Sequence, residues 1–168
     1  MSFAKVDDGP KTGLFKNRDL LRDTLIGPAA ANANIHAGDL VYYNNGWRQT
    51  SSTPQDLGKV RVSENAVDNT GGGAKGDKLV SSFGGGAIVT VTVGSLDKSG
   101  TDQAFAPGDF FVNAAGGTIV PPSVPSTTPA TTKYLGVVLG RADEVEGTAE
   151  DSANTALAEN DVVQVRFF

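Results

Sequence analysis

The chain contains no cysteine and a single histidine, His36, among its 168 residues. Without thiols it can form neither disulfides nor thiolate metal sites, and one histidine cannot build a histidine-rich site. His36 has no serine in a nucleophile-elbow sequence to act as its partner. We therefore expect a protein with no catalytic residues, no metal site and no cofactor.

Long apolar runs and basic clusters are also missing. No stretch approaches the roughly 18 apolar residues of a membrane span, and the first eight residues hold no apolar signal-peptide core. The formal net charge is -5, and lysine and arginine do not gather in one run. These features predict neither nucleic acid nor a membrane as a partner. We expect the protein to stay in the cytoplasm where it is made, or to leave by assembly or lysis.

A short phrase does recur: a Gly-Asp or Asn-Asp pair followed by an apolar run. Its four copies cover residues 38–43, 76–80, 108–112 and 160–165. Glycine, asparagine and aspartate adopt turn conformations that other residues resist, and the β-branched and aromatic runs suit strands. With 21 glycines in a length that fits one domain, the chain predicts a small, glycine-rich, all-β domain.

The expected strands share β-branched or alternating residues. They cover residues 40–43, 47–50, 59–63, 78–83, 87–93, 110–113, 118–120, 134–141 and 161–168. Asn45-Gly46 favours a type I′ hairpin turn. The strand over 59–63 has the period of a half-buried strand. Gly71 to Gly76 spells a dinucleotide-binding motif, but a β-like run follows it, so a hairpin loop is the better interpretation.

Two loops interrupt this pattern. Residues 121–133 are rich in proline and threonine, and proline cannot enter a sheet interior. Residues 142–158 are acidic, and we interpret their carboxylates as a solvated face. Residues 97–102 lack the spaced carboxylates of a calcium loop.

Residues 1–36 read as an N-terminal arm, followed by a single β domain over 37–168. Asn17 to Leu25 favours a short helix with Asn17 as its N-cap, and Gly27-Pro28 would end it. The arm carries a small apolar stripe, which packs either on its own domain or on another subunit. Trp47 and the tyrosines beside it leave a similar choice between a core position and an exposed interface anchor.

Four segments together resemble the capsid cement, or decoration, proteins of tailed bacteriophages. In that family an A-G-D-x-V-Y hairpin, an x-G-V-x-L strand and a terminal V-x-V-x-L strand recur in this order. The matching segments here are residues 37–43, 107–120, 134–139 and 162–167. The resemblance covers residues 35–168, and the chain departs from it in its long arm, its Pro/Thr loop and its acidic insertion.

The resemblance implies a small β-barrel or β-sandwich-like domain on the outside of an icosahedral capsid. Such proteins often form homotrimers at threefold or quasi-threefold positions, where they clamp major capsid protein subunits; an N-terminal arm typically adds a strand to a capsid-protein sheet. We thus expect a non-enzymatic protein of the virion, made in the host cytoplasm. The interface candidates are Phe3, Val6, Leu14, Phe15, Leu21, Leu25, Tyr42 and Trp47.

Two other functions fit the same strand pattern. One is a tail, fibre or other virion β domain. The other is a carbohydrate-binding module in which Trp47, Tyr42 and Tyr43 form a stacking platform.

Overall fold

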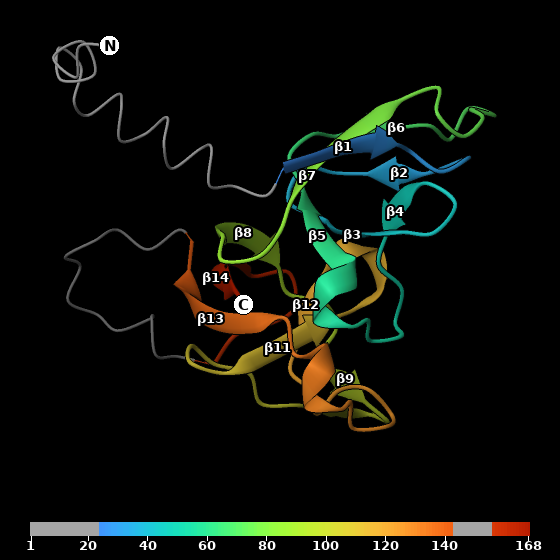
Figure 1. Cartoon of the computed structure of the whole chain (residues 1–168). Helices are drawn as coiled ribbons and strands as arrows, with labels where there is room; N and C mark the ends of the chain where they lie inside the picture. The colour runs from blue at the N-terminus through green and yellow to red at the C-terminus, as the bar shows by residue number, and fades with distance from the viewer. Residues whose placement is uncertain (1–23, 143–155) are drawn as a thin grey trace, which may run out of the picture.

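The computed structural model describes residues 24–142 and 156–168 and is all-β, as the sequence predicts (Figure 1). Two five-stranded antiparallel sheets and two small two-stranded sheets make up this part of the chain. Its helical elements are three short 3-10 turns, η1 (Leu57–Lys59), η2 (Ala115–Gly117) and η3 (Thr131–Lys133).

The first sheet has the strand order β1-β7-β5-β3-β4. Its strands are β1 (Thr24–Pro28), β7 (Leu79–Phe83), β5 (Val60–Ser63), β3 (Leu40–Tyr43) and β4 (Trp47–Gln49). The predicted hairpin between β3 and β4 is confirmed, with Tyr43 opposite Trp47. Asn45 and Gly46 both have positive φ, 52° and 107°, as a tight Asn-Gly connection requires.

The second sheet has the order β12-β11-β13-β14-β8. Its strands are β12 (Ile119–Val120), β11 (Phe110–Asn113), β13 (Gly136–Arg141), β14 (Val162–Phe167) and β8 (Ile88–Thr92). The sheet curls, so that Val93 after β8 forms a bridge with Ile119 of β12. The small sheets pair β2 (Asn34–Ile35) with β6 (Val67–Asp68), and β9 (Asp97–Lys98) with β10 (Thr101–Asp102).

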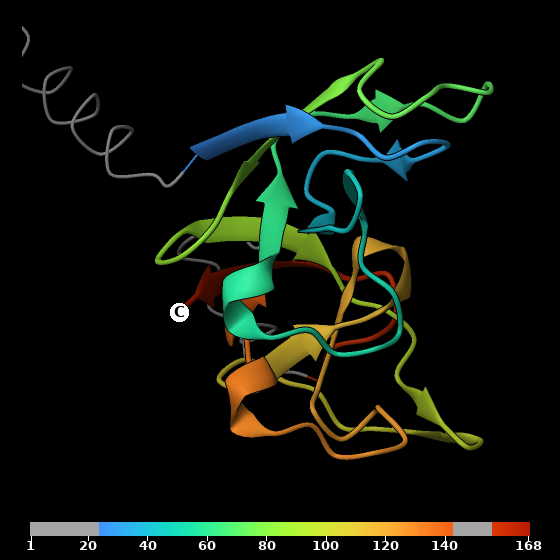
Figure 2. The same ribbon diagram turned by 45° about the vertical axis from the view of Figure 1, so that its right-hand side comes forward.

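The two large sheets share the main hydrophobic core, which gives a sandwich-like arrangement (Figures 1 and 2). Leu40 and Val62 of the first sheet pack there with Phe111 and Val165 of the second. A second cluster covers the other face of the first sheet and contains Ala29, Ala30, Ala33, Ile35, Val41, Trp47, Val67 and Val80.

Because both faces of the first sheet are covered, β5 is buried along its whole length. The expectation of a half-buried strand over 59–63 is therefore wrong. Arg61 is accommodated inside because its Nε and Nη2 donate to the Oγ and the backbone O of Ser82, at 3.1 and 3.2 Å. Alternation in the sequence reports side-chain type, and here hydrogen bonds allow the polar residues to be buried as well.

All four copies of the repeated phrase form the same turn. In each, the aspartate N–H donates to the carbonyl three residues earlier, and its carboxylate accepts the N–H of that same residue. The carboxylates of Asp39, Asp77, Asp109 and Asp161 lie 2.6, 2.7, 2.8 and 2.8 Å from the amides of His36, Ala74, Ala106 and Ala158. The residue before each aspartate has a φ of 90°, 90°, 93° or 71°. Glycine adopts this conformation freely and asparagine tolerates it, which explains the phrase.

Residues 24–36 belong to the β domain, although the sequence analysis places the end of the arm at residue 36. β1 pairs with β7 along its whole length, and β2 pairs with β6. The predicted helix is wrong at its end, because Thr24 and Leu25 are in a strand. Pairing with β7 outweighs the weak local helix preference. Residues 1–23, with the rest of that predicted helix, lie outside the described part.

The Pro/Thr loop lies outside the sheets, as predicted, and contains the short turn η3. Lys98 Nζ donates to the backbone O of Ser123 at 2.7 Å, and Lys133 Nζ lies 3.3 Å from Asp56 Oδ1. Of the acidic loop, only Ala142 and residues 156–158 are described, and Leu157 is buried in the main core.

Candidate interaction surfaces

Trp47 is a core residue, with 6% of its surface exposed. Its indole Nε1 lies so close to Gly27 that a Cβ there would be 2.6 Å away. Tyr43 contacts it edge-on, with ring centroids 5.5 Å apart. Tyr42 is half-buried and, as the neighbour of Tyr43 in β3, points to the opposite face. The structure therefore does not bring Trp47, Tyr42 and Tyr43 together as one exposed platform.

The strand β1 has an open edge with apolar flanks. β7 pairs with one side of it. The other side meets β4 only at its end, through the parallel bridge between Ala29 and Trp47, and the described residues give the rest of that side no strand partner. Ile26 is 70% exposed and Leu79 is 57% exposed, and the register with β7 places both on one face. Leu25 is half-exposed on the other face. We call Leu25, Ile26, Leu79 and the open edge the β1 surface.

This surface lacks the usual protection of an edge strand. Exposed edges are normally blunted by charged residues, bulges or prolines, because unpaired N–H and C=O groups invite another strand. The sequence of β1, Thr-Leu-Ile-Gly-Pro, has no charge, and its proline stands at the end. Leu25 was predicted as an interface candidate, whereas Ile26 and Leu79 were missed. The other arm candidates, Phe3, Val6, Leu14, Phe15 and Leu21, lie outside the described residues.

A second exposed apolar feature is an aromatic cluster on the outer face of the second sheet. The rings of Phe110 and Tyr134 are stacked with centroids 5.4 Å apart, and Phe168 contacts Phe110 at 5.9 Å. The sequence analysis did not predict this cluster, although the doublets Phe110-Phe111 and Phe167-Phe168 indicate exposed aromatic rings. Neighbours in a strand face opposite ways, so one phenylalanine of each pair must point outward.

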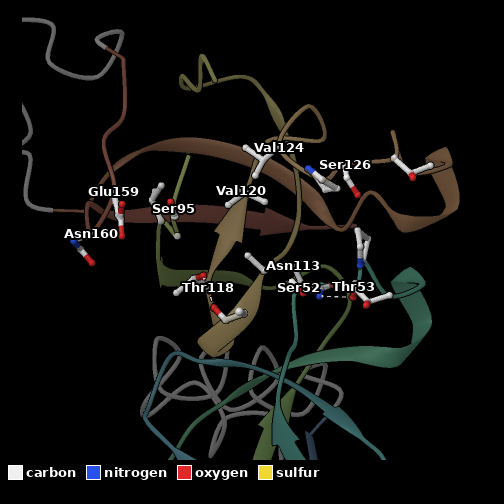
Figure 3. A pocket seen from close by; sticks show the side chains of 17 residues that line it. Ser52, Thr53, Ser95, Asn113, Thr118, Val120, Val124, Ser126, Glu159 and Asn160 are labelled. Atoms are coloured by element: carbon white, nitrogen blue, oxygen red, sulfur yellow. Dashed lines mark hydrogen bonds between the residues drawn. The ribbon is translucent and has the colours of Figure 1, made fainter. Parts of the chain in front are cut away.

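A cleft of about 740 Å³ lies between the Pro/Thr loop and the segment that follows β4 (Figure 3). Asn113 fixes this segment, because its side-chain amide donates to the backbone O of Ser51 and Thr53 and accepts the N–H of Gln55. Six of the seventeen residues that line the cleft carry hydroxyl groups, such as Ser52, Ser95 and Ser126, and most of the others are small apolar residues. Glu159 contributes the lining carboxylate, and no aromatic ring lines the cleft, so it lacks a stacking surface for a sugar.

The motifs that resembled chemical sites have structural roles. His36 is exposed, and its Nδ1 lies 3.3 Å from Asp39 Oδ2, the atom that accepts the N–H of His36 in the first repeated turn. Asp97 accepts the N–H of Gly100 in the hairpin between β9 and β10. The glycine loop over 71–76 leads into the strand β7 rather than a helix. Among the described residues, no three His, Asp or Glu side chains gather in a way that could hold a metal ion.

Two exposed aspartates have perturbed titration. Hydrogen bonds from Lys59 and Lys133 hold the pKa of Asp56 below its ordinary value. This ion pair connects η1 with η3, at the end of the Pro/Thr loop. The hydroxyl and amide of Thr70 lower the pKa of Asp68 in the same direction.

Comparison with known proteins adds no relative: no protein-family model and no curated protein matches this sequence. In the part of the chain that is described, no helix is long and apolar enough to cross a membrane.

Proposed function

We propose that this chain is a non-enzymatic structural protein of a virion, which binds the outer surface of an icosahedral capsid. There it stabilises contacts between major capsid protein subunits. The observation that carries the proposal is the β1 surface, an open strand edge with exposed leucine and isoleucine side chains beside it. The partner is inferred from the resemblance of residues 35–168 to capsid decoration proteins.

Strand addition is the mode of binding that this surface fits. A strand of the partner would satisfy the unpaired backbone groups of β1 and cover Ile26 and Leu79 at the same time. Full burial of such a side chain is worth about 1.5–3 kcal/mol, and each is already partly covered, so each contributes about 1 kcal/mol. Ordering of the chain offsets part of this gain.

The arm that precedes β1 extends the same contact. Its apolar residues Phe3, Val6, Leu14 and Phe15 bury further area across a subunit boundary when the arm binds the capsid. Each copy binds weakly. A homotrimer at a threefold or quasi-threefold position engages several capsid subunits at once and gains through effective concentration.

The test is to mix the purified protein with undecorated capsids of its own virus and to image the particles by electron microscopy. Regular density at threefold or quasi-threefold positions is the expected result. Bare capsids would contradict the proposal, and density confined to the tail would indicate a tail or fibre domain instead. Binding to a glycan array in place of capsids would favour the carbohydrate-binding alternative.

A further inference from the structure

The aromatic cluster of Phe110, Tyr134 and Phe168 is an apolar surface without a cover in the described structure. Phe110 is 46% exposed and Phe168 is 48% exposed, although both touch another ring. Large aromatic side chains gain most from burial, and contiguous exposed apolar patches on a small protein mark interaction sites.

The cluster continues across the outer face of the second sheet. The strand register places Phe110 opposite Val137, Val137 opposite Arg166, and Arg166 opposite Ile88. These residues point away from the core, because the residues that alternate with them in β14, such as Val165 and Phe167, are buried. The cluster and this row make one continuous face with a single charged side chain.

The N-terminal arm enters the described structure beside this face. Thr24, the first residue of β1, lies opposite Phe83, the last residue of β7. The link of Gly84 to Gly86 begins directly after Phe83. A Cβ on Gly85 would lie 3.6 Å from the backbone O of Phe168. In both views the start of β1 and the last residue lie on the same side of the molecule, with the yellow-green link between them (Figures 1 and 2).

We propose that residues 14–21 of the same chain cover the aromatic cluster in the free protein. This segment carries Leu14, Phe15, Leu20 and Leu21. Phe15 is nine residues before Thr24, so an extended chain places it up to about 30 Å away. The path from Thr24 to the cluster is shorter. Thr24 and its strand partner Phe83 are about 5 Å apart, and the two residues from Phe83 to Gly85 span about 7 Å at most. The segment therefore reaches the cluster without rearrangement of the domain.

Trypsin can test the contact, because Lys16 and Arg18 lie inside the proposed segment. The full chain without capsids is digested briefly, and cleavage after these residues is followed by mass spectrometry. Phe110→Ser and Phe168→Ser should each raise the cleavage rate by about fivefold or more, since cleavage follows the population with the segment released. Tyr43→Ser is the matched control: it changes a half-exposed ring on the first sheet, and it should leave the rate unchanged.

Three results would overturn the proposal. One is a wild-type rate equal to those of both cluster variants. Another is equal acceleration by Tyr43→Ser. The third is protection that disappears on dilution of about a hundredfold, because a contact within one chain does not depend on concentration; the occupant would then be a second copy. An unchanged thermal midpoint of the variants confirms that the domain is folded. No capsid is present, so this result is independent of the proposed function.

Discussion

At the scale of single residues, the aspartate of the repeated turn does two things with one side chain. Its backbone N–H closes the turn, and its carboxylate satisfies the N–H three residues earlier, which would otherwise face water or remain unpaired. The charge strengthens the hydrogen bond. This double role explains why aspartate rather than another turn-former recurs at all four positions.

We predict that Asp109→Ala lowers the free energy of unfolding by about 1 kcal/mol, the usual value for losing a side-chain bond to a turn or cap amide. Denaturant titration measures the change. Asp102→Ala serves as the matched control, because Asp102 is an exposed acid in β10 outside such a turn. If the two variants are equally stable, the carboxylate of Asp109 contributes nothing to the turn.

Gly136, the glycine of the x-G-V-x-L strand, is required for a different reason. A Cβ at this position would lie 2.0 Å from the backbone O of Arg166 and 2.8 Å from the ring of Phe111. We predict that Gly136→Ala destabilises the protein by about 3 kcal/mol, since strand backbone and a buried ring must move apart. Gly58→Ala is the control, with nothing within 4 Å of its new methyl group. Equal unfolding midpoints for the two variants would contradict this account.

At the scale of elements, the strands and turns could largely be predicted from the sequence, because their signals are local. The turn requires a positive φ at the residue before aspartate, which glycine and asparagine adopt readily. β-branched runs such as Ile88 to Thr92 favour extended backbone. The assignment of β1 could not be predicted. Leu21 and Leu25 have a helical spacing, and only the partner strand β7, more than 50 residues away in sequence, makes Thr24–Pro28 a strand.

The position of each strand in its sheet could not be predicted from the sequence either. β7 and β8 are separated by only three glycines and one alanine, yet they belong to different sheets. Whether Trp47 lies in the core or on the surface depends on Gly27 and on the second cluster, which packs on the far face of the first sheet. These are tertiary facts, and strand patterns in one sequence do not contain them.

One connection between elements depends on pH. Asp56 joins η1 to η3 through Lys59 and Lys133, and these bonds lower its pKa. Because the folded pKa lies below the ordinary value of 3.8, the stabilisation is present above that value and is lost as the pH falls through the folded pKa. We predict that Asp56→Asn lowers the unfolding midpoint slightly near neutral pH and not in strong acid. A difference that persists in acid would show that the ion pair is not its cause; salt should weaken it, since the pair is exposed.

At the scale of the whole molecule, two apolar surfaces flank the point where the arm meets the domain. The β1 surface offers backbone groups to an incoming strand, whereas the aromatic cluster offers rings and no open strand edge of its own. The two proposals assign them different occupants, a capsid subunit and residues 14–21. If the arm must leave the cluster before it binds the capsid, part of its binding free energy is spent on that release.

The β1 surface gives the sharpest test of capsid binding. We predict that Ile26→Lys weakens binding to undecorated capsids by about tenfold or more, since a lysine on an edge strand opposes pairing and a buried charge is costly. Val162→Lys is the matched control: it makes the same kind of change at a half-exposed residue of β14, on the second sheet. Co-sedimentation over a series of protein concentrations measures both affinities. Equal weakening by the two variants, or none by Ile26→Lys, would place the capsid contact away from β1, because only Ile26 lies beside the open edge.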